Sequence, residues 1–272
     1  MAVAGCLSGC ELLDLATGHG GSTSGSSVTL PPEPMTPPLS YEGFDAGNII
    51  SDQEFFDTDA MTEQDVTDFI DTWNEGCRTG ANGTPCLADF RENTRYFPAD
   101  QYCARDFAAV TQDSAASIVW RAAQACGINP QVLLVTLQKE QGLITASGKR
   151  LNASRYRSAM GYACPDSAAC DQDFYGFTNQ VYYAARQMRV YEALPDRYLA
   201  APGQTAMIKY AYPAECGAAE VLVENQATAN LYNYTPYQPN DAALHGVRGE
   251  CESPGNLNFY AYFNAWFVTG NQ

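Results

Sequence analysis

Eight cysteines spread through the last two hundred residues are the feature that most constrains the fold of this chain. Zinc sites use CxxC pairs or Cys/His clusters at ligand spacing, and neither pattern occurs. An even set of cysteines without such spacing predicts disulfides and an oxidising compartment outside the cytoplasm. We therefore expect a disulfide-stapled domain without a metal site. The eight residues are Cys77, Cys86, Cys103, Cys126, Cys164, Cys170, Cys216 and Cys251.

The sequence leaves the connectivity of these cysteines open. Order along the chain alone favours pairing each cysteine with the next one. This preference gives Cys77 with Cys86, Cys103 with Cys126, Cys164 with Cys170, and Cys216 with Cys251.

Two further cysteines lie at the N-terminus, in "VAGCLSGC". The segment "LSGC" resembles the lipobox of bacterial lipoproteins, in which the cysteine is lipidated, so Cys10 is the candidate and Cys6 the spare. The alternative is the end of a signal with two unmodified thiols. Neither a basic segment nor an apolar stretch of adequate length precedes Cys10, which predicts that most of the signal is missing from the chain.

Residues 1–45 and residues 46–272 differ in composition. After Cys10 the chain is rich in Gly, Ser, Thr and Pro, which predicts a flexible tether. From residue 46 onward the pattern is that of one folded domain without a second linker. A lipid anchor on Cys10 would hold this domain at the outer face of the cell membrane, or the protein is secreted. No later stretch reaches the roughly 18 apolar residues of a membrane span.

The charge balance excludes one class of partner. The chain has Asp+Glu 31 against Lys+Arg 15, a formal net charge of -16. Phosphate backbones are bound by lysine and arginine, so we expect no nucleic acid partner. The same charge repels anionic membrane surfaces and anionic wall polymers, whereas a neutral sugar chain is not affected.

Apolar residues at helical spacing predict a mainly α domain with a small loop/β region. A first helix spans 63–75 after the cap Thr62, and a second runs from the cap Thr111 to Gly127. A third begins with Asn129 as cap and Pro130 in the first position. Two more are predicted over 177–194 and 217–234, with loops over 78–102 and 145–173.

The third helix carries a candidate catalytic residue. Steps of four and three residues from Leu133 reach Leu137 and Glu140, so the three share an apolar face. A carboxyl partly withdrawn from water keeps its proton more readily, as a general acid must. The alternative is that Glu140, between Lys139 and Gln141, turns to solvent.

Three segments in this order resemble the motifs of the lysozyme-like superfamily, which includes lytic transglycosylases and goose-type lysozymes. They are "VLLVTLQKEQGL", "SAMGYAC" and "ATANLYNYTPY". The last one and "GFTNQVYYAARQM" are also similar to secreted actinobacterial proteins described as hemagglutinin-related. The resemblance covers about residues 112–240 and implies an α+β lysozyme-like fold.

The resemblance also implies roles for individual residues. Glu140 matches the catalytic acid, Gly161 the glycine of a loop that closes over the cleft, and Tyr232 with Asn233 a substrate-binding Tyr-Asn pair. The family has serine where this chain has Gln141, and Gly-Leu-Met-Gln where this chain has "GYAC". Gln141 and Tyr162 are therefore further candidate substrate contacts. Tyr232 has core packing as its alternative role.

The implied reaction is cleavage of peptidoglycan glycan strands between N-acetylmuramic acid and N-acetylglucosamine. In lytic transglycosylases one glutamate donates a proton to the leaving oxygen and then accepts one from the muramoyl C6 hydroxyl. A hydrolase needs a second carboxylate. The candidates are Asp166, Asp171 and Asp173, which are otherwise solvated loop residues. The many aromatic residues fit a sugar cleft or a helical core.

Other enzyme classes find no support in the sequence. His245 is the single histidine after the tether, no G-x-S-x-G surrounds a serine, and no Walker A, dinucleotide or HExxH motif occurs. We therefore expect no cofactor. The alternative function is a non-catalytic wall-binding or adhesion module on the same fold, and the sequence identifies no protein partner in the envelope.

Overall fold

The structure is a computed structural model that describes residues 34–247 and 249–268. It is mostly helical, with 44% helix against 8% strand, two small sheets and four disulfides. The α-rich fold class agrees with the prediction. Cys6, Cys10 and residues 11–33 of the predicted tether lie outside the described residues.

The described elements alternate short and long helices with two antiparallel strand pairs. The helices are α1 (Asp52–Phe55), α2 (Glu63–Trp73), α3 (Ala115–Cys126), α4 (Pro130–Gln141), α5 (Ala153–Arg157), α6 (Phe177–Ala193), α7 (Gln226–Tyr234), α8 (Asp241–Leu244) and α9 (Gly255–Phe263), followed by a π-helical turn, Asn264–Val268. The strands are β1 (Arg91–Glu92), β2 (Asp113–Ser114), β3 (Gln204–Lys209) and β4 (Ala218–Val223).

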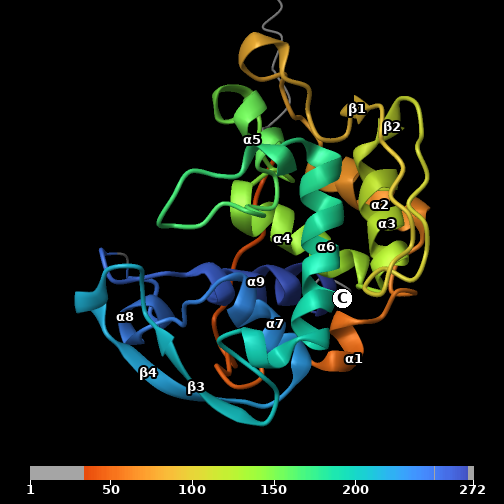
Figure 1. Cartoon of the computed structure of the whole chain (residues 1–272). Helices are drawn as coiled ribbons and strands as arrows, with labels where there is room; N and C mark the ends of the chain where they lie inside the picture. Colours follow the sequence, from red (N-terminus) through yellow and green to blue (C-terminus); the bar gives the residue numbers. More distant parts are fainter. Residues whose placement is uncertain (1–33, 248, 269–272) are drawn as a thin grey trace, which may run out of the picture. The chain divides into compact units, whose positions relative to one another are not determined.

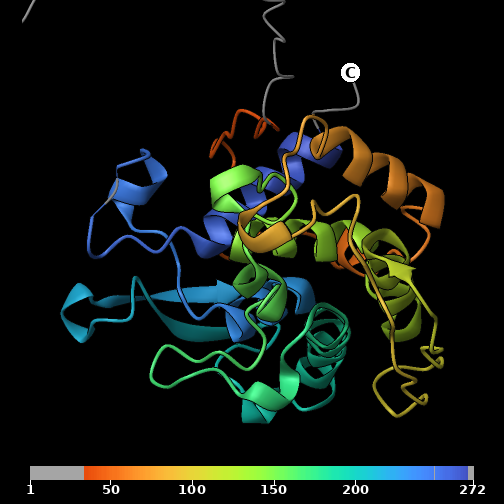
Figure 2. The same ribbon diagram turned by 90° about the horizontal axis from the view of Figure 1, so that it is seen from above.

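Helices α3 and α4 form the centre of the core. Helix α3 packs against α2, α4 and α6, while α4 packs against α9, and α6 against α7. Residues Val132–Gln138 of α4 are all buried. Figures 1 and 2 show the β3–β4 hairpin projecting away from the side that carries α2, β1 and β2. Helix α4 therefore passes through the core, and its end lies beside α5, where a Cβ on Gly142 would lie 3.5 Å from Arg155 Nη1.

Three of the predicted helices are observed close to their predicted limits. Helix α2 follows the cap Thr62, whose hydroxyl accepts from the Asp65 backbone N–H. Helix α4 starts as expected, with Asn129 accepting from the N–H of Gln131 and Pro130 in the first position. Helix α6 ends one residue before the predicted limit. Local capping decides the starts of α2 and α4, because each cap satisfies a backbone donor that the helix itself leaves free.

The other two helix predictions need correction. The cap of α3 is Ser114, not Thr111, because Asp113 and Ser114 pair with β1 before the helix begins. The segment 217–234 is not one helix, since its first part forms β4 and pairs with β3 from Gln204↔Val223 to Lys209↔Ala218. In β4, Val221 and Val223 are buried while Leu222 is exposed, which is the alternation of a strand with one covered face.

The four disulfides join Cys77 to Cys86, Cys103 to Cys126, Cys164 to Cys170, and Cys216 to Cys251. Each cysteine is bonded to the next one along the chain, which is the preferred pairing from the sequence. Two of these bonds close short loops, with sequence separations of 6 and 9. The loop between Cys164 and Cys170 lies beside the sites described below.

The start of the domain packs closely against its end. Phe44 makes an edge contact with Tyr260 of α9, with ring centroids 5.5 Å apart. The Tyr260 hydroxyl donates to the Glu42 carbonyl at 2.7 Å. A Cβ on Gly43, which has φ +80°, would lie 2.8 Å from that hydroxyl oxygen. Residues 42–44, predicted as tether, therefore belong to the packed domain.

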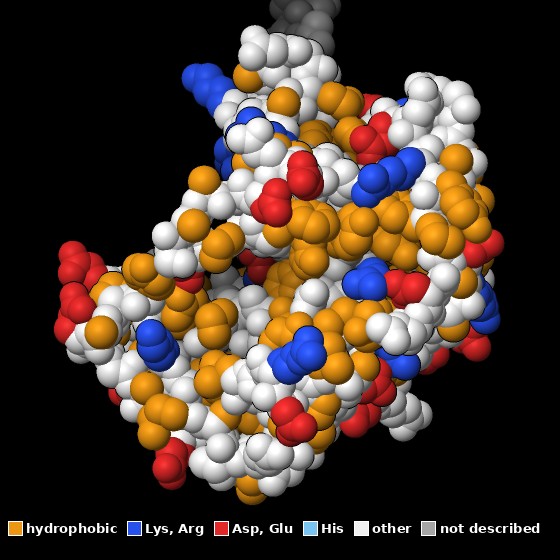
Figure 3. Space-filling view, in the orientation of Figure 1, with side chains coloured by type: hydrophobic (Ala, Val, Ile, Leu, Met, Phe, Trp, Pro, Cys, Tyr) orange, Lys and Arg blue, Asp and Glu red, His pale blue; other side chains and the backbone are white. Residues whose placement is uncertain are grey.

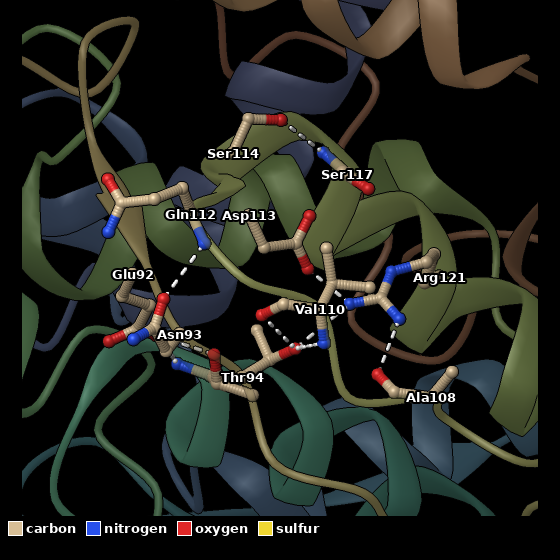
Figure 4. Close-up of polar contacts among 11 residues, drawn as sticks. Glu92, Asn93, Thr94, Ala108, Val110, Gln112, Asp113, Ser114, Ser117 and Arg121 are labelled. Carbon is tan, nitrogen blue, oxygen red and sulfur yellow. Dashed lines mark hydrogen bonds and ion pairs between the residues drawn. The ribbon is translucent and has the colours of Figure 1, made fainter.

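A buried ion pair holds α3 to the β1–β2 region (Figure 4). Arg121 bonds to Asp113, whose side chain is 3% exposed, and donates to the Ala108 carbonyl at 2.7 Å. It also covers the Phe107 ring at 4.1 Å. Thr94 and Val110 tie the neighbouring strands through bonds of 2.9 Å. The arginine thus serves several partners inside the protein.

Candidate active site

Glu140 lies at the C-terminal end of α4, where the helix leaves the core. Leu133 and Leu137 on the same face are fully buried, while the Glu140 side chain is 24% exposed. Gly142 then ends the helix with φ +59°, a left-handed conformation that suits glycine. The carboxyl group is therefore partly withdrawn from water. The sequence left open whether it faces the apolar core or turns to solvent, and its position lies between these two alternatives.

The partner of Glu140 is the preceding residue, Lys139. Its side chain is only 4% exposed, and its Nζ lies 2.7 Å from Glu140 Oε1. The same Nζ donates to Thr235 Oγ1 at 2.6 Å and lies 5.7 Å from the Tyr234 ring centroid. This contact between opposite charges fixes the position of the Glu140 side chain. The sequence analysis treated Lys139 as a flanking residue and missed this role.

Gly161 meets the other oxygen of the same carboxylate. A Cβ at Gly161 would lie 2.9 Å from Glu140 Oε2, closer than real Cβ contacts, and φ is +69°. Two features therefore require glycine at this position: the left-handed backbone conformation and the short distance to the Glu140 carboxylate. The structure brings together Glu140 and Gly161, which lie in two segments singled out from the sequence.

The loop around Gly161 is fastened by Gln180 of α6, which the sequence analysis did not identify. The Gln180 Oε1 accepts from the backbone N–H of Met160 at 3.2 Å and of Tyr162 at 3.0 Å. Its Nε2 donates to the carbonyls of Tyr162 and Phe174 at 3.0 and 2.9 Å. Because this amide is fully buried, the four bonds hold the loop against α6 without competition from water.

The third segment reaches the site through Tyr234, rather than through the Tyr-Asn pair expected from the resemblance. The Tyr234 hydroxyl donates to the Met160 carbonyl at 2.7 Å. Burial, and then the nearby charge of Glu140, raise the pKa of Tyr234 well above its ordinary value. Tyr234 therefore joins α7 to the Gly161 loop beside the catalytic candidate.

Tyr232 and Asn233 take structural positions. Tyr232 is fully buried and its hydroxyl donates to the Ala46 carbonyl at 2.9 Å. Asn233 accepts from the Ala200 N–H and donates to the Ala200 carbonyl, both at 2.9 Å. These bonds hold α7 in place, and neither side chain is directed at Glu140. This geometry gives Tyr232 a role in core packing, which was the alternative considered from the sequence.

The two further candidates, Tyr162 and Gln141, differ in their surroundings. Tyr162 follows Gly161, stacks on Tyr183 at 5.8 Å and meets the edge of Phe174 at 5.1 Å. Burial raises the pKa of Tyr162, so its hydroxyl stays protonated at neutral pH. Gln141 is the partly exposed last residue of α4.

The surface beside these residues is hollowed. Figure 3 shows a hollow between the loop that follows α5 and the β3–β4 hairpin, with hydrophobic side chains on its rims and charged atoms at its floor. A pocket of about 300 Å³ is lined on one side by Asp166 and Ser167 and on the other by Met207, Lys209, Pro236 and Tyr237. The two linings follow Gly161 and Thr235 in the chain, and Glu140 itself is not among the residues that line this pocket.

Asp166 is the member of the acidic loop that lines this pocket. It accepts a hydrogen bond from the Tyr237 hydroxyl, and burial together with that carboxylate raises the pKa of Tyr237. Asp171 instead caps a short turn by accepting from the Asp173 N–H at 3.0 Å, and both are exposed. The Cys164–Cys170 disulfide closes this loop.

The chain matches a family model described as LasA, N-terminal domain, over residues 48–267. The chain belongs to this family. No curated protein and no solved structure matches it. The matched range contains α4, the Gly161 loop and α7, so every residue of the site lies inside the LasA N-terminal domain.

LasA is a staphylolytic peptidase, and its family acts on the cell wall. Membership in the LasA N-terminal domain family therefore indicates peptidoglycan as the target and a peptidoglycan-hydrolysing enzyme. The family is extracellular, as the disulfides also indicate. Within residues 34–247 and 249–268, no helix has the length and apolar character needed to cross a membrane.

The described part of this LasA-family domain contains no group of three or more His, Cys, Asp or Glu side chains placed to hold a metal ion. The groups around Glu140 are instead an ammonium, a hydroxyl, a phenol and backbone. This arrangement can move a proton at Glu140 and hold neutral polar ligands in the hollow.

Proposed function

We propose that this domain cleaves the glycan strands of peptidoglycan with Glu140 as the single acid and base, in the manner of a lytic transglycosylase. The observation that carries the proposal is that two segments distant in the chain meet the end of α4 at one partly exposed carboxylate. Gly161 lies beside its Oε2, Lys139 of the same helix holds its Oε1, and Tyr234 lies near enough for the charge of Glu140 to raise its pKa.

The two oxygens of Glu140 have different surroundings, which suits the proposed reaction. Oε1 is held by Lys139, while Oε2 faces the Gly161 loop. In the first step the Glu140 carboxyl donates a proton to the glycosidic oxygen, and Lys139 stabilises the carboxylate that remains. In the second step this carboxylate accepts the proton of the muramoyl C6 hydroxyl, and the sugar closes to a 1,6-anhydro product.

The ion pair sets a condition on the first step. The Lys139 ammonium lies 2.7 Å from Glu140 Oε1, so we infer that bound substrate loosens this contact when Glu140 donates its proton. We assign this effect to sugar hydroxyls and acetamido groups that compete for the Lys139 ammonium. Tyr162 and Gln141, at the edges of the site, contact the sugar rings.

Product analysis tests the proposal. Purified peptidoglycan is digested with the wild type, with Glu140→Gln and with the matched control Glu192→Gln, and the products are identified by mass spectrometry. We expect 1,6-anhydromuropeptides from the wild type and the control, and none from Glu140→Gln. Products with free reducing ends would show a hydrolase, with Asp166 as the carboxylate that activates water. Newly freed peptide amino groups would show a peptidase instead.

The second candidate function is glycan binding without cleavage, which the resting Lys139–Glu140 pair supports. The carboxylate oxygens of this pair can accept hydrogen bonds from sugar hydroxyls. In that case the wild type would sediment with insoluble peptidoglycan and release no fragments. Glu140→Gln would then weaken sedimentation without any change in products.

We further propose that Cys10 is lipidated and that the Gly/Ser/Pro-rich segment holds the domain at the outer membrane face. Cys10→Ser should move the protein from the membrane fraction to the medium. Recovery of Cys10→Ser in the membrane fraction, with Cys6→Ser released, would move the assignment to Cys6.

A further inference from the structure

The pocket of about 300 Å³ beside the β3–β4 hairpin gathers exposed apolar side chains. Leu199, Met207 and Tyr212 line it, and they are 48%, 54% and 55% exposed. The described residues include ten large hydrophobic side chains with such exposure, and three of the ten line this one pocket. Exposed apolar side chains normally lie scattered, so their clustering in a pocket indicates a ligand site. We call this site the hairpin pocket.

Two opposite charges line the hairpin pocket together with these apolar groups. Asp166 lies on one side, in the loop that the Cys164–Cys170 disulfide closes, and Lys209, the last residue of β3, lies on the other. Asp166 accepts a hydrogen bond from the Tyr237 hydroxyl, and its carboxylate has room for further donors. The Lys209 ammonium makes no hydrogen bond or ion pair with any described residue. Each charge can therefore still bind a charged group of a ligand.

Buried amides hold the walls of the hairpin pocket in place. The Gln238 Nε2 donates to the carbonyls of Ile208 and Ala219, both at 2.9 Å, and so fixes the hairpin to the segment 236–238. The Asn256 Nδ2 donates to the Tyr237 carbonyl at 3.0 Å. Both amide side chains are buried, so water does not compete for these bonds. The pocket wall is therefore formed before any ligand binds.

The hairpin pocket begins one residue away from a contact of the proposed catalytic pair. The Thr235 Oγ1 accepts from Lys139 Nζ at 2.6 Å, and the same Nζ lies 2.7 Å from Glu140 Oε1. Pro236, the next residue after Thr235, lines the pocket. Since consecutive Cα atoms are about 3.8 Å apart, the pocket wall starts close to this pair. A group in the pocket and a sugar at Glu140 can therefore belong to one molecule.

We propose that the hairpin pocket binds the peptide stem that is attached to the muramoyl sugar of peptidoglycan. This inference rests on the proposed function, because both take peptidoglycan as the ligand. A stem with a free amino group carries carboxylates, aliphatic side chains and an ammonium. Lys209 binds a stem carboxylate, Asp166 binds the stem ammonium, and Met207 contacts the aliphatic groups between them. A glycan without peptides supplies no ammonium and no aliphatic side chain, so the pocket selects peptide-substituted strands.

Calorimetry on the full chain tests this inference with three probes. The first is the disaccharide GlcNAc-MurNAc with an attached tetrapeptide stem that has a free amino group. The second is the same molecule acetylated at that amine, and the third is GlcNAc-MurNAc alone. None of them contains the MurNAc-GlcNAc bond of the proposed reaction, so binding is measured without turnover. We expect the first probe to bind the wild type about tenfold more tightly than the third.

Single-charge variants assign the two contacts. Asp166→Asn should weaken binding of the first probe about tenfold, the loss expected for one hydrogen bond between charged groups. Acetylation of the amine should weaken binding to the wild type by a similar factor. It should cost Asp166→Asn nothing further, because the two changes remove the same contact. Lys209→Gln should also bind the first probe about tenfold more weakly, but it should stay sensitive to acetylation.

Two charge-matched controls separate a site from general attraction. Asp241→Asn and Lys149→Gln remove the same charges from exposed positions and should bind the first probe within about twofold of the wild type. Equal losses in these controls would overturn the inference, as would an absence of binding to the wild type. A GlcNAc-MurNAc affinity equal to that of the first probe would overturn the peptide assignment. Equal effects of acetylation on the wild type and Asp166→Asn would overturn the contact with Asp166.

The outcome can be distinguished from that of the cleavage proposal. Glu140→Gln keeps the hairpin pocket and should bind the first probe within about twofold of the wild type. If Glu140→Gln abolished product release while the Asp166 and Lys209 variants bound normally, cleavage would stand and this inference would fail. If the wild type released no products but bound the stem through Asp166 and Lys209, the cleavage proposal would fail and stem binding would stand.

Discussion

Two ion pairs of this protein have opposite arrangements. In the Arg121–Asp113 pair the acid is almost completely buried and the cation is the more exposed partner, at 3% and 17%. In the Lys139–Glu140 pair the cation is buried and the acid is the more exposed partner, at 4% and 24%. The more exposed partner is therefore the cation in the first pair and the acid in the second.

The surroundings explain this difference. The charge of Asp113 is neutralised inside the protein, where Arg121 also serves a backbone carbonyl and an aromatic ring. Glu140 keeps one oxygen beside a glycine without a side chain, and its side chain is 24% exposed. The first pair closes off its acid, whereas the second holds its acid in position and leaves it accessible to solvent.

The largest expected effect concerns the second pair. Glu140→Gln keeps the size and hydrogen-bonding atoms of the side chain but removes its proton chemistry. We expect release of glycan fragments to fall about 100- to 10,000-fold, the usual contribution of a general acid or base. Turnover of soluble peptidoglycan fragments measures it. Equal loss in the control Glu192→Gln, which disrupts an exposed pair with Arg189, would contradict the assignment.

The next effect concerns the first pair. Asp113→Ala leaves the Arg121 charge without its partner, and we expect the free energy of unfolding to fall by about 3 to 5 kcal/mol. For a domain of this size that lowers the melting temperature by about 6 to 20 °C. Differential scanning calorimetry measures it. Activity per folded molecule should not change, and a specific loss of activity would break the comparison drawn above.

A third prediction separates strain from contact at Gly161. Gly161→Ala forces a left-handed residue and places a methyl group against Glu140, whereas Gly203→Ala has the same strain, with φ +75°, and open space. Each should lose about 1 to 2 kcal/mol of stability from backbone strain. Activity should fall in Gly161→Ala alone. If Gly203→Ala lost as much activity, the contact with Glu140 would have no special role.

The smallest expected effect is at Tyr234. Tyr234→Phe removes one hydrogen bond to the Met160 carbonyl, worth about 1 kcal/mol. Since the pKa of Tyr234 is raised in the folded state, its neutral form contributes stability that is complete below pH 10 and is lost as pH rises. Urea unfolding between pH 8 and 11 should therefore show a shallower alkaline decline in the variant.

Local sequence signals predicted the parts of the fold that depend on neighbouring residues. The start of α4 follows from Asn129 and Pro130, which set the helix by themselves. The start of α7 depends on β4, which exists through pairing with β3 about fifteen residues earlier in the chain. A short apolar stretch fits a helix as well as a strand when its pairing partner is unknown. This is why the sequence predicted a single helix over 217–234.

The candidate site shows the same limit. Glu140 and Gly161 could be found because the family resemblance marks them. Lys139 acquires its role from Thr235, almost a hundred residues away, and Gln180 from a loop on another element. Tyr232 was predicted from the resemblance, whereas Tyr234 was not. The two side chains lie about 200° apart around α7, so Tyr232 packs toward Ala46 while Tyr234 reaches Met160.

The loop from Cys164 to Cys170, which a disulfide closes, can vary in sequence independently of its surroundings. Gln180 anchors the chain just before it, at residues 160–162, and the carbonyl of Phe174 just after it. The five residues between the two cysteines are thus held apart from the loop around Gly161, while Asp166 and Ser167 among them form one wall of the pocket. Substitutions in this short loop could therefore change the pocket wall without moving Gly161 or Glu140.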